Sequence, residues 1–194
     1  MNDLNNGILF EESNVFLKWG KQIKSLSDDE KKHGVVAASA GNHAQGVALA
    51  SSLENISCTI VMPKNASPAK VAATRGYGAT VILEGKNYDE SWTKAQEIAK
   101  TTGATIIHAF DDSQIIAAQG VIGLEIIEQL PDVDEIYVPI GGGGLASGVL
   151  TAVKSKNPNV KIIGVQSKSF PSMKNSLDSG DIETVNGGFT VADG

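Results

Sequence analysis

The sequence has very little of several features that mark whole classes of protein. Cys58 is the only cysteine among 194 residues, so no disulfide framework of the kind that staples small secreted domains can form. The net charge is −6 and no basic cluster is interleaved with aromatic residues, which argues against nucleic-acid binding. No stretch approaches the roughly eighteen consecutive apolar residues of a membrane span, and no basic-plus-apolar leader opens the chain. These absences predict a cytoplasmic protein that does not cross a membrane.

What the chain does contain is typical of a globular core, with 41% hydrophobic residues and a mean hydropathy of −0.04. From residue 34 onward, short apolar runs alternate with longer segments of helical periodicity. Such alternation predicts βαβ units and therefore an α/β fold with parallel sheets. The expected strands are 14–18, 35–39, 58–62, 80–83, 105–108, 135–140 and 161–165. The expected helices are 42–53, 68–76, 89–101, 114–129, 145–155 and 171–177. The polar segment 21–32 shows only weak helical patterning.

The expected elements divide the chain into two parallel-sheet units. Residues 34–110 are interpreted as a small parallel α/β domain. Residues 1–33 and 111–194 together are interpreted as a partial large α/β domain. Because open parallel sheets bind ligands at the carboxyl ends of their strands, we expect the two units to share a cleft there.

Four consecutive glycines, Gly141, Gly142, Gly143 and Gly144, separate the strand at 135–140 from Leu145 and the helix that follows. A strand, a turn without Cβ atoms and a helix N-terminus favour an anion, because backbone N–H groups can close around its oxygens and the helix dipole adds positive charge. A flexible turn is the alternative. Linker glycines usually have serine and polar neighbours, however, whereas these lie between apolar segments. The pattern therefore predicts a phosphate site.

Two common phosphate ligands fit this loop less well. Gly141, Gly143 and Ala146 loosely follow the dinucleotide pattern, but the next strand is followed by Gln166, where a ribose-binding acid is expected. Nicotinamide dinucleotides remain an alternative. No Gly-Lys-Ser or Gly-Lys-Thr follows the glycines, so a nucleoside triphosphate P-loop is disfavoured.

A second strand-to-helix junction occupies residues 37–46, Ala-Ala-Ser-Ala-Gly-Asn-His-Ala-Gln-Gly. Ser39, Asn42 and the backbone N–H groups of this turn could hold a carboxylate at the helix end. Plain helix capping by Ser39 or Asn42 is the alternative, and His43 has no serine–histidine–acid set to join. Two such junctions in one chain favour a ligand site.

At these residues the chain resembles the fold-type II pyridoxal phosphate enzymes, in the branch of threonine/serine ammonia-lyases (dehydratases) and serine racemases. The similarity runs from about residue 33 to residue 194. It implies two Rossmann-like units, the larger one incomplete, with pyridoxal 5′-phosphate as cofactor and an amino acid as substrate. The implied reaction removes the β-hydroxyl of threonine or serine and yields a 2-oxo acid and ammonia. Besides the two loops, the resemblance is carried by 60–63, 70–79, Phe110-Asp111-Asp112, 118–120 and 190–194.

The resemblance also implies roles for individual residues. The cofactor phosphate would be held through the backbone amides of Gly141, Gly142, Gly143, Gly144 and Leu145. Asn42 would hydrogen-bond the hydroxyl of the pyridine ring. The loop around the substrate carboxylate would consist of Ser39, Ala40, Gly41, Asn42 and His43.

Two positions refine the expected chemistry within this branch. Racemases of this type tend to carry serine where Ala40 stands, and a methyl group cannot carry a proton, so the ammonia-lyase reaction is favoured over a serine racemase-like one. Metal-dependent members carry glutamate where Gln166 stands, so no metal is expected there.

The lysine that binds the cofactor covalently in this family lies in a Ser-Phe-Lys-x-Arg-Gly segment, which this sequence does not contain. Residues 14–19 resemble the strand before that segment and residues 20–26 the helix after it. Lys18, Lys21 and Lys24 are the candidates to replace it, although an active amine needs desolvation. The sequence also stops before the residue that contacts the pyridine nitrogen in the family. A fragment, a degenerate gene product and one piece completed by another chain are the three interpretations.

Three classes of function therefore stay open. The first is a pyridoxal phosphate lyase. The second is a non-catalytic binder that keeps the phosphate and carboxylate loops. The third is a partner subunit that associates with an intact relative. A homo-oligomer or association with a complementing chain is expected, without nucleic acid or membrane.

Overall fold

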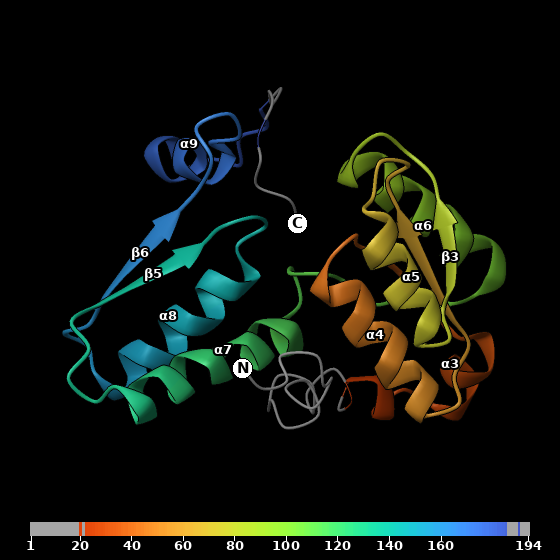
Figure 1. Ribbon diagram of the computed structural model, residues 1–194, viewed down its shortest axis with the longest axis horizontal. Coiled ribbons are helices and arrows are strands. Elements are labelled where there is room, and N and C mark those ends of the chain that lie inside the picture. Colours follow the sequence, from red (N-terminus) through yellow and green to blue (C-terminus); the bar gives the residue numbers. More distant parts are fainter. Residues whose placement is uncertain (1–19, 21, 186–189, 191–194) are drawn as a thin grey trace, which may run out of the picture. The chain divides into compact units, whose positions relative to one another are not determined.

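The computed structural model describes residues 20, 22–185 and 190. They form two compact units, the first ending at Ala109 and the second beginning at Phe110. In Figure 1 the first unit runs from red to green and the second from green to blue. The expected α/β fold with parallel sheets is confirmed.

A four-stranded parallel sheet in the order β3-β2-β1-β4 forms the centre of the first unit. The register pairs Val35 with Cys58 on one side and with Thr105 on the other. The central strand is buried along its whole length, which explains its uninterrupted run of apolar residues. The strands are β1 (Val35–Ala38), β2 (Cys58–Met62), β3 (Thr80–Leu83) and β4 (Thr105–Ile106).

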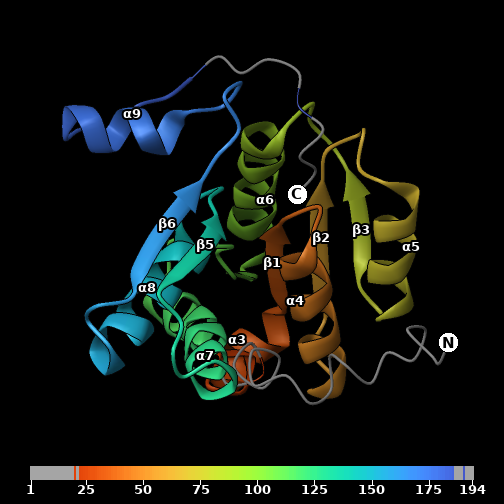
Figure 2. The same ribbon diagram turned by 60° about the vertical axis from the view of Figure 1, so that its left-hand side comes forward.

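Helices cover both faces of this sheet. On one face lie α4 (Asn42–Leu53) and α5 (Pro68–Gly76), and on the other lies α6 (Tyr88–Thr102) (Figure 2). Val36, Ala38 and Val61 pack with Ala95 of α6 in one core cluster. Side chains alternate along a strand, so the other face of β1 is buried against α4.

The second unit is built on two parallel strands, β5 (Glu135–Pro139) and β6 (Lys161–Val165). The helices of this unit are α7 (Ser113–Gln129), α8 (Gly144–Lys156) and α9 (Ser172–Ser179). The core of the unit is a cluster of buried residues from β5, α8 and the turn before β6: Ile136, Val138, Val149, Val153 and Val160.

Glycines allow α7 and α8 to cross closely. A Cβ at Gly148 would lie 2.7 Å from the amide nitrogen of Gly120 and would overlap the carbonyl oxygen of Ile116. A Cβ at Gly123 would lie 2.9 Å from Val153 of α8. The two helices therefore meet backbone to backbone, which fixes where α8 begins relative to α7.

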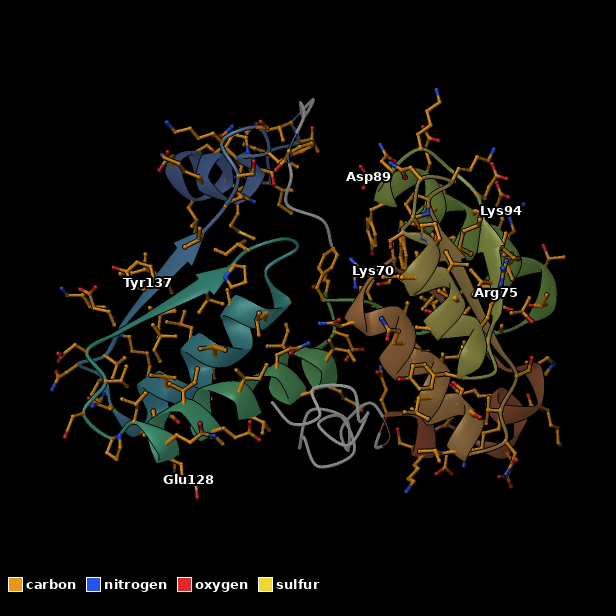
Figure 3. The ribbon with its side chains drawn as sticks, viewed as in Figure 1. Lys70, Arg75, Asp89, Lys94, Glu128 and Tyr137 are labelled. Carbon is orange, nitrogen blue, oxygen red and sulfur yellow. The ribbon has the colours of Figure 1, made fainter. Side chains whose placement is uncertain are left out.

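The opposite face of the β5–β6 sheet carries apolar side chains without a helix from the described residues over it. Tyr137 alternates with the buried Ile136 and Val138 and is 63% exposed. Figure 3 shows Tyr137 on the side of the sheet away from α7 and α8. Its neighbours on this face include Val165, which is 51% exposed.

Most expected elements are confirmed, with ends within two residues of the observed ones. The expected strand at 105–108 is too long, since β4 ends at Ile106. The Ile107 amide still donates to Val36 (2.9 Å), but the Ile107 carbonyl lies 3.1 Å from the His43 ring nitrogen, so the ladder stops there.

The polar segment 21–32, with its weak helical patterning, does not form one helix among the described residues. Gly20 and 22–24 are helical, but the chain then turns and a separate helix, α3 (Asp28–His33), begins after Ser27. Ser27 and Glu30 form a reciprocal capping box, which stabilises a new helix start rather than a continuation. The expected strand at 14–18 lies outside the described residues. The grouping of residues 1–33 with the second domain stays a prediction, although α3 lies in the first unit.

Candidate functional site

The first candidate loop connects β1 to α4 and contains Ser39, Ala40 and Gly41. The Ser39 amide donates to the Val61 carbonyl at 3.1 Å, which continues the pairing with β2. The Gly41 amide then donates to Ser39 Oγ at 3.2 Å and closes a tight turn. Gly41 is the N-cap of α4 and makes no side-chain cap, so the serine hydroxyl binds the turn itself rather than the first helical amides. Ala40 is half-buried and brings only a methyl group to this turn.

Asn42 and His43 begin α4 and differ in their surroundings. Asn42 is exposed, whereas the His43 side chain is only 8% exposed and its Nε2 lies 3.1 Å from the Ile107 carbonyl oxygen. That distance assigns the ring proton to Nε2, which donates. Burial lowers the pKa of His43 to about 4, with a smaller contribution from the charge of His108. The His43 ring is therefore neutral at pH 7 and engaged in the core, and its backbone N–H is what it can offer a ligand.

The four glycines form the turn between β5 and α8. Gly143 has φ +91° and is the N-cap of α8, and its carbonyl accepts from the Ser147 amide at 2.9 Å. The left-handed φ explains the need for glycine at this position. Leu145 packs its side chain on the core cluster of the second unit, which leaves its backbone at the helix start.

The glycines of this loop differ in how closely other residues approach them, and this shows where a phosphate would have room. A Cβ at Gly142 would lie 2.5 Å from Phe110 Cδ1, and one at Gly144 would lie 2.9 Å from the Phe110 backbone. A Cβ at Gly141 would meet nothing within 4 Å. One side of the loop is thus packed on Phe110, and a Cβ at Gly143 would lie 2.8 Å from Met173 Cε, so the loop is open at Gly141 just before α8. An anion fits such a site because the first N–H groups of a helix have no partner within the helix.

A pocket of about 680 Å³ adjoins Gly143 within the second unit. Its lining is mainly apolar and includes Ile140, Leu150 and Met173, with Gln166 at one side. Gln166 Oε1 accepts from the amides of Met173 (3.2 Å) and Lys174 (3.4 Å), and so caps α9. Among the described residues no three His, Cys, Asp or Glu side chains are grouped to hold a metal ion. The expectation of no metal at Gln166 stays a prediction.

The lysine candidates are located only in part. Lys18 and Lys21 lie outside the described residues. The Lys24 ammonium is 66% exposed and lies 3.5 Å from Glu54 Oε1. This is a solvated ion pair, whereas an amine that attacks at neutral pH needs desolvation or a neighbouring positive charge.

The structure adds residues that the sequence analysis did not single out. Phe110 was noticed only as part of a motif, and its packing under the glycines was not expected. The partnership of His43 with Ile107 was also missed, because a carbonyl leaves no sequence signal. Cys58 is buried in β2, and burial raises the pKa of its thiol to about 11. The assignment of both loops to one ligand site stays a prediction.

Comparison with known proteins gives these loops a context. L-threonine ammonia-lyase of Thermotoga maritima is 56% identical over 173 residues, which cover 89% of this chain and 43% of that protein. The L-threonine dehydratase catabolic TdcB of Staphylococcus aureus (strain USA300) is 48% identical over 185 residues, 95% of this chain and 54% of that protein. The chain thus spans about half the length of the curated relatives it matches.

Solved structures agree with these relatives. The processed form of threonine deaminase isoform 2 from Solanum lycopersicum superposes with a TM-score of 0.78 at 44% identity, covering 88% of this chain and 47% of that one. Maize serine racemase gives a TM-score of 0.80 at 36% identity, covering 90% of this chain and 53% of that one.

No helix among the described residues is both long and apolar enough to cross a membrane.

The family comparison covers both loops and almost the whole chain. A sequence model described as "Pyridoxal-phosphate dependent enzyme" matches residues 14–194. This range includes the turn at Ser39–His43, the four glycines and Phe110. The chain therefore belongs to the family of pyridoxal-phosphate dependent enzymes.

Proposed function

We propose that this chain carries the cofactor-phosphate and substrate-carboxylate loops of a threonine or serine ammonia-lyase. The observation that carries the proposal is the glycine loop, packed on one side by Phe110 and open at Gly141 just before the N-terminus of α8. The relatives named L-threonine ammonia-lyase and L-threonine dehydratase support the same reaction. When bound, pyridoxal 5′-phosphate would supply the electron sink for loss of the Cα proton and the β-hydroxyl.

In this proposal the chain binds mainly through its backbone. The phosphate is held by the N–H groups of Gly141 to Leu145, assisted by the dipole of α8. Asn42 is exposed at the start of α4 and donates from its amide to the ring hydroxyl. Ser39, Gly41 and the His43 backbone orient the substrate carboxylate. Because the His43 ring is neutral and buried, its side chain takes no proton from the substrate.

Ala40 favours elimination over racemisation. Racemisation needs a proton donor on the second face of the substrate, and the Ala40 methyl group cannot supply one. The serine racemase structures among the neighbours keep the alternative in view. Serine recovered after partial reaction should therefore keep its L configuration, as chiral chromatography would measure. Accumulation of D-serine would support the racemase-like alternative.

The amine that binds the cofactor is the open element of the proposal. An absorbance titration of the purified chain with pyridoxal 5′-phosphate, followed by borohydride reduction and peptide mass spectrometry, locates any covalent adduct. A single modified lysine among Lys18, Lys21 and Lys24, together with release of 2-oxo acid from L-threonine or L-serine, would support the lyase. Arginine variants at each of these lysines are the matched controls, because they keep the charge. Saturable binding without a site-selective adduct would favour the non-catalytic binder.

We also propose a cytoplasmic location and self-association. A single free, buried cysteine suits a reducing compartment. Among the described residues, most of the large apolar side chains that are exposed lie in the second unit, for example Leu130, Tyr137 and Leu177. Exposed apolar area of this kind marks interaction surfaces. Light scattering across a concentration series should show a dimer or larger species; a monomer that associates only with a full-length relative would support the complementing-chain alternative.

A further inference from the structure

Phe110 packs directly against the glycine loop at Gly142 and Gly144. Its ring occupies the position that a Cβ at Gly142 would take, with Cδ1 and Cδ2 both 2.5 Å from that point. Its backbone lies equally close to Gly144, since Cα and the carbonyl oxygen of Phe110 are each 2.9 Å from the corresponding Cβ position. The loop therefore rests on one residue at two of its four glycines.

Phe110 is itself held in place within the second unit. Two residues later, Asp112 Oδ1 accepts from the amides of Gln114 (2.8 Å) and Ile115 (3.1 Å) and caps α7. Helix α7 packs against α8 at Gly120 and Gly148, and α8 begins directly after the loop. Phe110, α7, α8 and the loop are thus linked by successive contacts, so the loop cannot move toward Phe110 without displacing α7 or α8.

We propose that Phe110 is a positioning residue for the phosphate loop. Its ring prevents the backbone at Gly142 from collapsing inward and so keeps the loop's N–H groups directed at the open side. The inference rests on the proposed function for the identity of the anion, but the packing role concerns the chain alone. Phe110 touches the loop and not the phosphate, so it acts through Gly142 and Gly144.

Amide hydrogen exchange tests the packing role without any cofactor. In Phe110→Ala, exchange of the peptide covering 141–147 should rise by at least about tenfold, because the loop loses its support. Phe170→Ala is the matched control, since it removes the same side chain from a position outside the loop contacts. Unchanged exchange in Phe110→Ala, or an equal rise in Phe170→Ala, would overturn the proposal. Should Phe110→Ala fail to fold, Phe110→Leu is measured instead, with a smaller rise expected.

A double substitution tests the contact itself. Gly142→Ala alone should disturb the loop, because the new methyl group meets the Phe110 ring. Combined with Phe110→Ala, the same methyl group has room, so the double variant should exchange more slowly than the product of the two single effects predicts. Gly141→Ala is the control within the loop, since its Cβ position is open. Strictly multiplicative effects would contradict the contact.

Ligand binding separates this inference from the proposed function. Phe110→Ala should weaken pyridoxal 5′-phosphate by roughly tenfold or more and leave pyridoxal, which has no phosphate, unchanged. Equal weakening of both ligands would overturn the phosphate-loop role. If the wild-type chain binds neither ligand, the proposed function fails, while the exchange experiment still decides the role of Phe110.

Discussion

Acid should destabilise the first unit through His43. Its Nε2 binds the Ile107 carbonyl at 3.1 Å and its side chain is buried, so protonation would place a charge in the core. A pKa near 4 in the folded chain, against about 6.5 in the unfolded chain, corresponds to about 3 kcal/mol. Because the folded pKa is the lower one, this stability is fully present above about pH 6.5 and is lost as the pH falls toward 4.

Urea unfolding followed by tryptophan fluorescence measures this loss. Both tryptophans, Trp19 and Trp92, precede Phe110 in the sequence, so the signal reports on the first part of the chain. The Trp92 and His108 ring centroids lie 4.7 Å apart, so Trp92 reports on the packing of α6 against the segment after β4. The free energy of unfolding should fall by about 3 kcal/mol more between pH 7 and pH 4 in the wild type than in His43→Gln.

His43→Gln is the informative variant because its amide can still donate toward Ile107 but does not titrate. It should be less stable than the wild type at pH 7 and show a shallower dependence on pH. His33→Gln, at the exposed end of α3, removes a histidine without removing a buried ring and is the matched substitution. If His43→Gln kept the wild-type slope, the argument from burial would be refuted.

Three further predictions test the helix packing, the helix capping and the thiol reactivity of the chain. Gly148→Ala should destabilise the second unit by about 1–3 kcal/mol, because the new methyl group overpacks against α7. Gly76→Ala, in open space at the end of α5, should be neutral or stabilising by up to about 1 kcal/mol. Amide hydrogen exchange of the helix peptides measures both variants, and equal effects of the two substitutions would contradict the close crossing of α7 and α8. Asp112→Ala should cost about 0.5–2 kcal/mol by removing the cap of α7, measured by the same exchange, and Asp112→Asn should retain most of it. Cys58, with its pKa near 11, should react with a disulfide reagent at pH 8 at least about a hundredfold more slowly in the folded chain than in urea, and similar rates would contradict its burial.

Local patterns were sufficient to predict most of the fold. The apolar run at 35–39 predicted a strand, which the structure shows as the buried β1, and the expected helix at 89–101 is α6, which ends at Gly103 in the left-handed conformation. The structure differs from the prediction where a residue far away in the sequence determines the end of an element. β4 ends early because the His43 ring, from 64 residues away in the sequence, lies at the Ile107 carbonyl. No periodicity encodes such a contact.

The candidate site was predictable to a different degree. The glycines and the Ser39–His43 turn could be found because strand, turn and helix start follow one another in the sequence. The floor under Gly142 could not, since Phe110 is more than thirty residues away and belongs to a different element. The direction of the His43 side chain was equally hidden, because the sequence only places it in the first turn of α4.

In the proposed function both loops would bind their ligands mainly through the backbone, which predicts which substitutions matter. Each loop follows a parallel strand and opens a helix, and neither His43 nor any glycine brings a charged side chain to it. Apart from the Asn42 amide, affinity would then come from N–H groups whose direction is fixed by backbone conformation. In such a site the sensitive positions are those that set the backbone: Gly143 through its φ of +91°, Gly142 through the Phe110 ring, and Ser39 through its bond to the Gly41 amide. Side chains that merely line the loops should tolerate change far better than these three.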